Sequence, residues 1–122
     1  MIGYVCIGTN DMPRATRFYD ELAAVLGAKR QWDTERFCAW GRTPTDSMLA
    51  VIKPLDTKAA TVGNGTMVSL QAESKAQVDA LHNKALALGG KDEGPPGLRS
   101  EDFYAAYFRD LEGHKLAVFY SS

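Results

Sequence analysis

The chain has 122 residues and 45% hydrophobic side chains, a size and composition typical of one globular domain. Lysine and arginine number 14 against 15 aspartates and glutamates, which gives a net charge of -1. Because no excess positive charge exists to hold a phosphate backbone, we expect no nucleic-acid partner. The start of the chain lacks the cationic segment of a signal peptide, and no apolar run approaches membrane-spanning length, so we expect no membrane partner.

The first half of the chain predicts one helix among short strands. Residues 3–7 alternate in bulk as a strand does, and Thr9-Asn10-Asp11 followed by Pro13 is a typical helix start. Apolar residues then recur along one helical face as far as Gly27, a left-handed cap. Three further strand-like segments follow, at residues 28–33, 36–42 and 47–53.

The second half repeats this order. Residues 66–72 predict a strand, Ser74-Lys-Ala-Gln77 is a capping box, and Gly89-Gly90 end the second helix. Residues 91–93 predict a short strand and Gly94-Pro-Pro-Gly97 a loop. The chain closes in a hairpin over residues 103–119, whose turn is Asp110-Leu-Glu-Gly113.

The two halves match at a constant offset. Asp11 and Ser74 lie 63 positions apart, as do Gly27 and Gly90. We therefore predict an α+β fold of two βαβββ modules, each with a helix on one face of its sheet. Module one spans residues 1–55, a linker spans 56–64 and module two spans 65–122. The bare sheet faces would curl around a shared cup.

Strand alternation assigns side chains to the two faces. In the first strand Val5 and Ile7 are predicted to face the helix, and Tyr4 and Cys6 the cup. In the last strand Leu116, Val118 and Tyr120 are predicted on the helix side, with Lys115, Ala117 and Phe119 facing inward. The predicted cup residues are Tyr4, Cys6, Met48, Ala50, Ile52, Met67, Ser69, Ala117 and Phe119, with Trp40 and Tyr107 from neighbouring strands.

These features resemble the vicinal oxygen chelate superfamily, which contains glyoxalase I, extradiol dioxygenases, fosfomycin-resistance enzymes and bleomycin-binding proteins. Besides the paired modules, the resemblance is carried by two segments, Thr9-Asn-Asp-Met-Pro-Arg-Ala-Thr-Arg-Phe-Tyr19 and Phe108-Arg-Asp-Leu-Glu-Gly-His-Lys-Leu116. It covers essentially the whole chain. It specifies the fold better than the activity, because this scaffold serves lyases, transferases, oxygenases and non-catalytic binders. It also implies a homodimer.

Enzymes of the superfamily hold a divalent metal with His and Glu side chains from four inner strands. Carried over to this sequence, those positions are Tyr4, Ala50, Met67 and Ala117, where a metalloenzyme would need oxygen or nitrogen ligands. We therefore predict that the metal centre of the superfamily is missing, and we predict no cofactor. The two histidines, His82 and His114, are expected away from the cup floor.

The remaining chemistry leaves alternatives open. An apolar, aromatic cup is typical of a small-molecule pocket, but the same side chains would also serve as a filled second core. Cys6 and Cys38 lie in strand-like segments, which favours inert thiols and a reduced, cytoplasmic setting. The Tyr4 phenol is a candidate proton donor or a wall residue. Arg99 and Lys115 would anchor an anionic ligand or be solvated surface charges.

Three functional hypotheses follow. The first is a metal-free, glyoxalase-like protein that binds a small, partly apolar molecule in its cup. The second is an enzyme of the same superfamily, such as a lyase, that uses Tyr4 or other polar cup groups for acid–base chemistry. The third is an interaction module whose bare sheets serve dimerisation.

Overall fold

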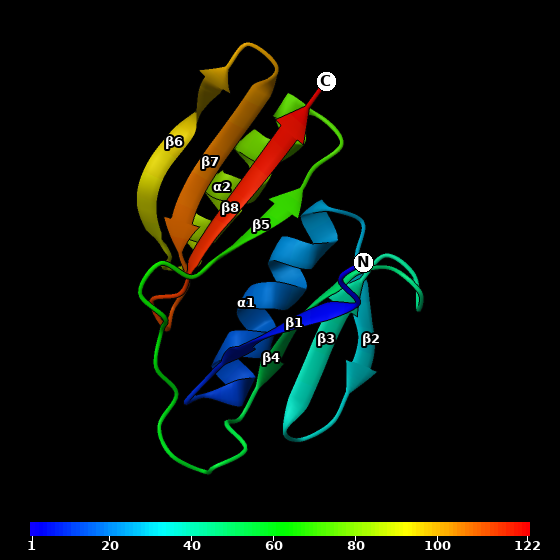
Figure 1. Cartoon of the computed structure of the whole chain (residues 1–122), viewed down its shortest axis with the longest axis vertical. Coiled ribbons are helices and arrows are strands. Elements are labelled where there is room, and N and C mark those ends of the chain that lie inside the picture. The colour runs from blue at the N-terminus through cyan, green and yellow to red at the C-terminus, as the bar shows by residue number, and fades with distance from the viewer. The chain divides into compact units, whose positions relative to one another are not determined.

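The computed structural model describes all 122 residues, Met1 to Ser122. The chain divides into two compact units, Met1–Gly63 and Asn64–Ser122. Each unit contains one helix and four strands in the order β-α-β-β-β (Figure 1). The predicted α+β class with two βαβββ modules is confirmed. Neither helix has the length and apolar character that a membrane span requires.

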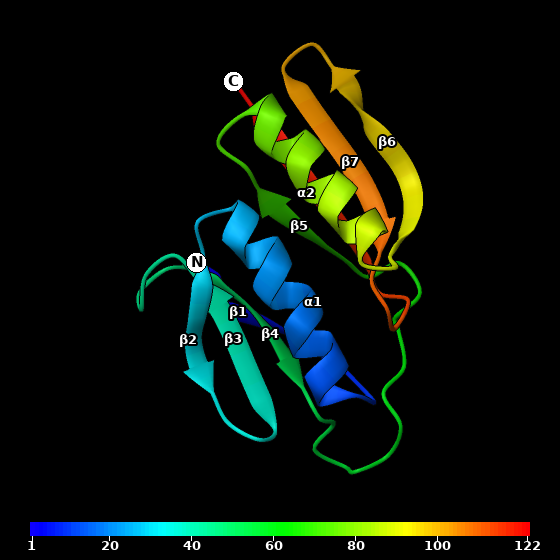
Figure 2. The ribbon, with the colours of Figure 1, turned by 180° about the vertical axis from the view of Figure 1, so that it is seen from behind.

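The first unit is a four-stranded sheet with helix α1 (Met12–Val25) on one face. Strand β1 (Tyr4–Gly8) pairs in parallel with β4 (Met48–Ile52). Strand β3 (Phe37–Gly41) lies between β4 and β2 (Lys29–Asp33) and is antiparallel to both. Figure 2 shows α1 crossing the sheet.

The second unit repeats this topology, with helix α2 (Lys75–Ala87) on one face. Strand β5 (Met67–Gln71) pairs in parallel with β8 (Lys115–Ser121), which is antiparallel to β7 (Phe103–Arg109). Strand β6 (Lys91–Ser100) completes the sheet as an edge strand beside β7.

The helix and turn signals of the sequence act as predicted. Asp11 and Ser74 cap the two helices, because their side chains accept hydrogen bonds from the N–H groups of Arg14 and Gln77. Gly113 has φ 98° in the β7–β8 turn, a conformation that favours glycine. In the same turn one carboxylate oxygen of Asp110 accepts two backbone N–H groups, from Glu112 and His114.

The structure contradicts the prediction for residues 94–97. This segment was predicted as a loop, but it lies inside β6, which continues to Ser100. Proline is tolerated there because β6 is an edge strand, whose outer N–H groups have no ladder partner. The register shifts between Asp92 and Gly94, between Gly94 and Gly97 and between Leu98 and Ser100, so the strand is irregular at three places.

The residues that follow β4 pack back onto the first unit. The Asn10 side chain exchanges two hydrogen bonds with Ala60, donating to its carbonyl at 3.1 Å and accepting from its N–H at 2.7 Å. Gly8 lies directly beside this contact: a Cβ at Gly8 would come within 2.9 Å of the Ala60 Cβ. Ala60 of the predicted linker is therefore held against the end of β1.

Candidate functional site

Each sheet has one face covered by its helix and one face without a helix, which we call the open face. In the second unit, side-chain bonds to α2 identify the covered face. The Tyr104 hydroxyl donates to Asp79 at 2.6 Å, and His82 Nε2 lies 3.0 Å from Asp92 Oδ1. Strand pairing then places alternate residues of all four strands on the open face.

The predicted alternation is confirmed in the first and last strands. Ile7 in β1, and Leu116 and Val118 in β8, are buried on the covered faces. Of the predicted cup residues, those on the open face of the first unit are Tyr4, Cys6, Met48, Ala50 and Ile52. Those on the open face of the second unit are Met67, Ser69, Tyr107, Ala117 and Phe119.

The predicted position of Trp40 is wrong. The sequence predicted this residue in the cup, but it lies on the covered face and is 4% exposed. Its indole N–H donates to Asp20 of α1 at 2.8 Å, and its ring contacts Tyr19 with centroids 5.6 Å apart. The open-face positions of β3 are Phe37, Ala39 and Gly41 instead, because side chains alternate along the strand.

Aromatic rings gather on the open face of the first unit. The Phe37 ring meets Tyr4 edge-on, with centroids 5.9 Å apart, and Trp32 with centroids 5.4 Å apart. Tyr4 and Trp32 are 58% and 59% exposed, whereas Ala39 and Ala50 on the same face are buried. The rings therefore form an exposed aromatic surface over a floor of small side chains.

The two cysteines differ in accessibility. Cys6 is exposed on the open face, and partial burial of its sulfur raises the pKa of the thiol. Cys38 is fully buried, and this burial raises its pKa to about 11. Both thiols are protonated at neutral pH, and a protonated thiol is a poor nucleophile.

The open face of the second unit also combines an alanine floor with aromatic walls. Ala105 and Ala117 are buried although no helix covers them. Phe103 and Phe119 stack nearly parallel, with centroids 5.2 Å apart and planes at 20°. The Tyr107 ring lies beside them in the same sheet, with two cationic side chains over it.

The metal site that the resemblance implies does not fit these residues. Its four positions hold Tyr4, Ala50, Met67 and Ala117, which together offer one phenol oxygen and one thioether. No three His, Cys, Asp or Glu side chains are grouped so that they could hold an ion. His82 lies on the covered face, bonded to Asp92. We derive no chemistry through a metal.

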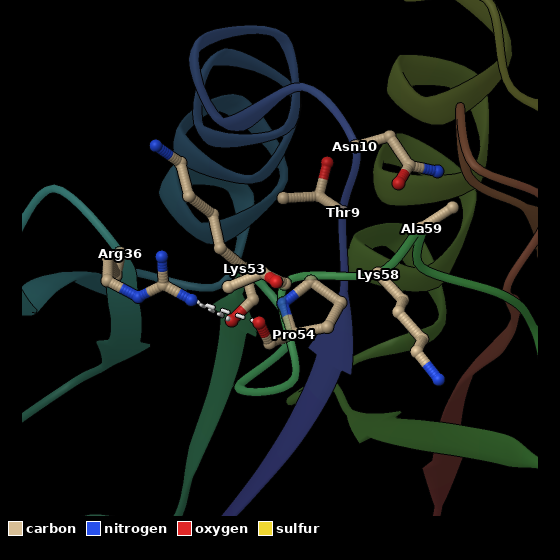
Figure 3. A pocket seen from close by; sticks show the side chains of 8 residues that line it. Thr9, Asn10, Arg36, Lys53, Pro54, Lys58 and Ala59 are labelled. Carbon is tan, nitrogen blue, oxygen red and sulfur yellow. Dashed lines mark hydrogen bonds between the residues drawn. The ribbon is translucent and has the colours of Figure 1, made fainter.

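A separate groove of about 240 Å³ lies in the first unit (Figure 3). Its lining residues are Thr9, Asn10, Arg36, Lys53, Pro54, Thr57, Lys58 and Ala59. The Arg36 guanidinium donates to the carbonyls of Lys53 and Pro54, and Lys53 Nζ lies 3.6 Å from Glu35. Of the three cationic side chains that line the groove, Arg36 and Lys53 thus bind other groups of the chain. None of the predicted site residues lines the groove.

Trp32, Phe37 and Phe103 were missed by sequence reasoning. The position of Phe103 follows from the same alternation as Tyr107, four residues later, so that signal was available. The position of Trp32 could not be predicted from strand alternation. The register shifts between Arg30 and Trp32, and such a bulge reverses the alternation.

Two β-α-β-β-β units, each with an open sheet face, define the class of protein to which this chain belongs. A family model described as Glyoxalase/Bleomycin resistance protein/Dioxygenase superfamily matches residues 1–118. The chain belongs to this superfamily, and the resemblance seen in the sequence is confirmed.

Solved structures agree with this membership. The chain is 32% identical to a glyoxalase/bleomycin resistance protein from Albidiferax ferrireducens T118, with a TM-score of 0.91 over 100% of this chain and 99% of that one. A glyoxalase/bleomycin resistance protein/dioxygenase family enzyme from Burkholderia phytofirmans PsJN is 21% identical, with a TM-score of 0.76 over 98% of each chain. A glyoxalase-related enzyme from Fulvimarina pelagi is 17% identical, with a TM-score of 0.76 over 99% of this chain and 88% of that one. The last two show the fold alone. A comparison with curated proteins found no match.

Proposed function

We propose that this protein binds a small, partly apolar molecule on an open sheet face, without a metal ion of the superfamily's usual kind. One observation carries the proposal: aromatic rings stand around a floor of short side chains on a face that no helix covers. In the second unit the floor is Ala105 and Ala117, and the walls are Tyr107 and the Phe103–Phe119 stack.

The composition of this face supports ligand binding. Small-molecule sites are mostly apolar and aromatic, with a few polar groups that fix the orientation of the ligand. Met67 supplies exposed apolar surface at the edge of the sheet. Ser69 lies next to Ala117 in the strand pairing and supplies a hydroxyl. Ala105 and Ala117 are themselves buried beneath these side chains, so a ligand would contact the aromatic rings and would reach the alanines only where the rings move apart.

A second candidate function rests on the first unit. The exposed rings of Tyr4 and Trp32 would lose unfavourable contact with water if a second copy of the chain covered them. This surface supports the homodimer that the resemblance implies. The rings of this second candidate lie on the first sheet, and those of the proposed ligand site lie on the second.

Thermal-shift screening tests the binding proposal. A library of metabolites and antibiotics is added to the purified protein, with and without divalent metals. A ligand at 100 times its Kd raises the free energy of unfolding by about 2.7 kcal/mol, a shift that is easily measured. Ser69→Leu, which places bulk on the open face, should remove the shift. Ala80→Leu, at an exposed position of α2, should retain it. The proposal fails if no compound acts, or if both variants respond alike.

A further inference from the structure

The Gly94–Arg99 segment of β6 fixes the position of the Arg99 guanidinium. Arg99 Nη2 donates to the Pro95 carbonyl at 2.6 Å, and the guanidinium lies 5.3 Å from the centre of the Tyr107 ring. Two glycines make this possible. A Cβ at Gly94 would lie 3.0 Å from Tyr107 Cδ2, and a Cβ at Gly97 would lie 3.1 Å from Arg99 Nη1. The Gly-Pro-Pro-Gly sequence thus holds the guanidinium against the ring.

A second cation shares the same ring. Lys115 Nζ lies 5.5 Å from the centre of the Tyr107 ring. The two cationic groups are therefore at most about 11 Å apart. Neither forms a salt bridge within the chain. The charge of Lys115 helps to lower the pKa of Glu93, but that carboxylate bonds to Arg109 at 2.7 Å. This bond holds the pKa of Glu93 below its usual range.

The charge of this face differs from that of the whole chain. Strand pairing and contacts place Lys91, Arg99, Arg109 and Lys115 on the open face of the second unit, with Glu93 as the counter-charge. The face is thus strongly cationic, although the chain as a whole has a net charge of -1. A local excess of one sign attracts ligands of the other.

We propose that the open face of the second unit binds a small organic carboxylate. Its carboxylate group lies beside Tyr107 between Arg99 and Lys115, and its apolar body lies on the Phe103–Phe119 stack. This rests on the proposed binding function and adds the charge of the ligand. Arg99 offers a planar pair of N–H donors, which suits a carboxylate, and Lys115 adds a point charge.

Isothermal titration calorimetry with matched ligand pairs tests the inference. Each aromatic or aliphatic carboxylate, such as benzoate, is compared with its neutral amide, such as benzamide. The carboxylates should bind more tightly than the amides, and their affinity should fall as salt is raised. Arg99→Gln and Lys115→Gln should each weaken carboxylate binding about tenfold or more, while amide binding stays unchanged. Lys91→Gln removes a charge from the same face away from Tyr107 and should change affinity about twofold or less.

The outcomes separate the two proposals. If amides bind as tightly as carboxylates, or if Lys91→Gln weakens binding as much as Arg99→Gln does, the proposed carboxylate site is wrong, while the proposal of ligand binding stands. If neither kind of probe binds while a compound of the thermal-shift library does, the carboxylate proposal is wrong and the binding proposal stands; if no compound of either set binds, both are wrong. Circular dichroism of each variant confirms that it is folded. Arg99→Lys keeps the charge and loses the planar donor pair, so it should give an affinity between those of wild type and Arg99→Gln.

Discussion

Replacing Trp40 by phenylalanine tests which face of the first sheet is covered. The mutation removes the 2.8 Å hydrogen bond to Asp20 and part of the packing against Tyr19. A hydrogen bond to a charged group is worth about 1.5–3 kcal/mol. The lower end applies, because Asp20 keeps two bonds from Arg30 and water can reach its side chain. With about 1 kcal/mol for lost packing, the free energy of unfolding should fall by about 2–3 kcal/mol.

The matched control is Trp32→Phe, the same substitution on the open face. Trp32 is exposed and its indole makes one edge contact, with Phe37, so the free energy of unfolding should change by about 0.5 kcal/mol or less. Urea unfolding followed by circular dichroism at constant m-value measures both variants. Equal losses in the two variants, or a larger loss in Trp32→Phe, would refute the assignment of the faces.

Three further predictions concern metal content, acid stability and thiols. Elemental analysis of the purified protein should find only substoichiometric divalent metal, and a full equivalent would contradict the account of the ligand positions. Arg30 holds the pKa of Asp20 below its usual value. The stabilisation from Asp20 is therefore complete above about pH 4 and is lost as the pH falls through the lowered pKa, so Asp20→Asn should flatten the acid limb of a stability–pH curve. An unaltered acid limb would speak against this ion pair. A thiol reagent should modify Cys6 in the native protein and Cys38 only after unfolding; simultaneous reaction would show that Cys38 is accessible.

The architecture could be predicted because its signals are local and occur twice. The helix starts at Asp11 and Ser74 repeat at an offset of 63, and a repeat of that length identifies a module. The predicted match of Gly27 with Gly90 is one residue off, because α2 is one residue shorter than α1 and the left-handed glycine that follows it is Gly89. The turn glycine Gly113 adopts the φ that its sequence context requires. Capping and turn chemistry depend on a few neighbouring residues, so they can be inferred without tertiary contacts.

The candidate site could be predicted only in part, because faces and bends depend on strand pairing. Alternation placed Ala117 and Phe119 correctly on the open face. It was not applied to β3, so Trp40 was predicted in the cup as a residue of a neighbouring strand, although its partner is Asp20 of α1. The position of Arg99 depends on three register shifts of β6, the last of them between Leu98 and Ser100, and no local sequence signal predicts where an edge strand bends.

The most direct test of the central claim is a methyl NMR titration of alanine-labelled protein with the best-binding ligand. If the molecule binds on the open face of the second unit, the methyl resonances of Ala105 and Ala117 should shift progressively with ligand concentration. The resonance of Ala85, buried in α2 on the covered side, should stay in place. Shifts centred on Ala85, or a titration that leaves Ala105 and Ala117 unmoved while the ligand binds, would contradict the account.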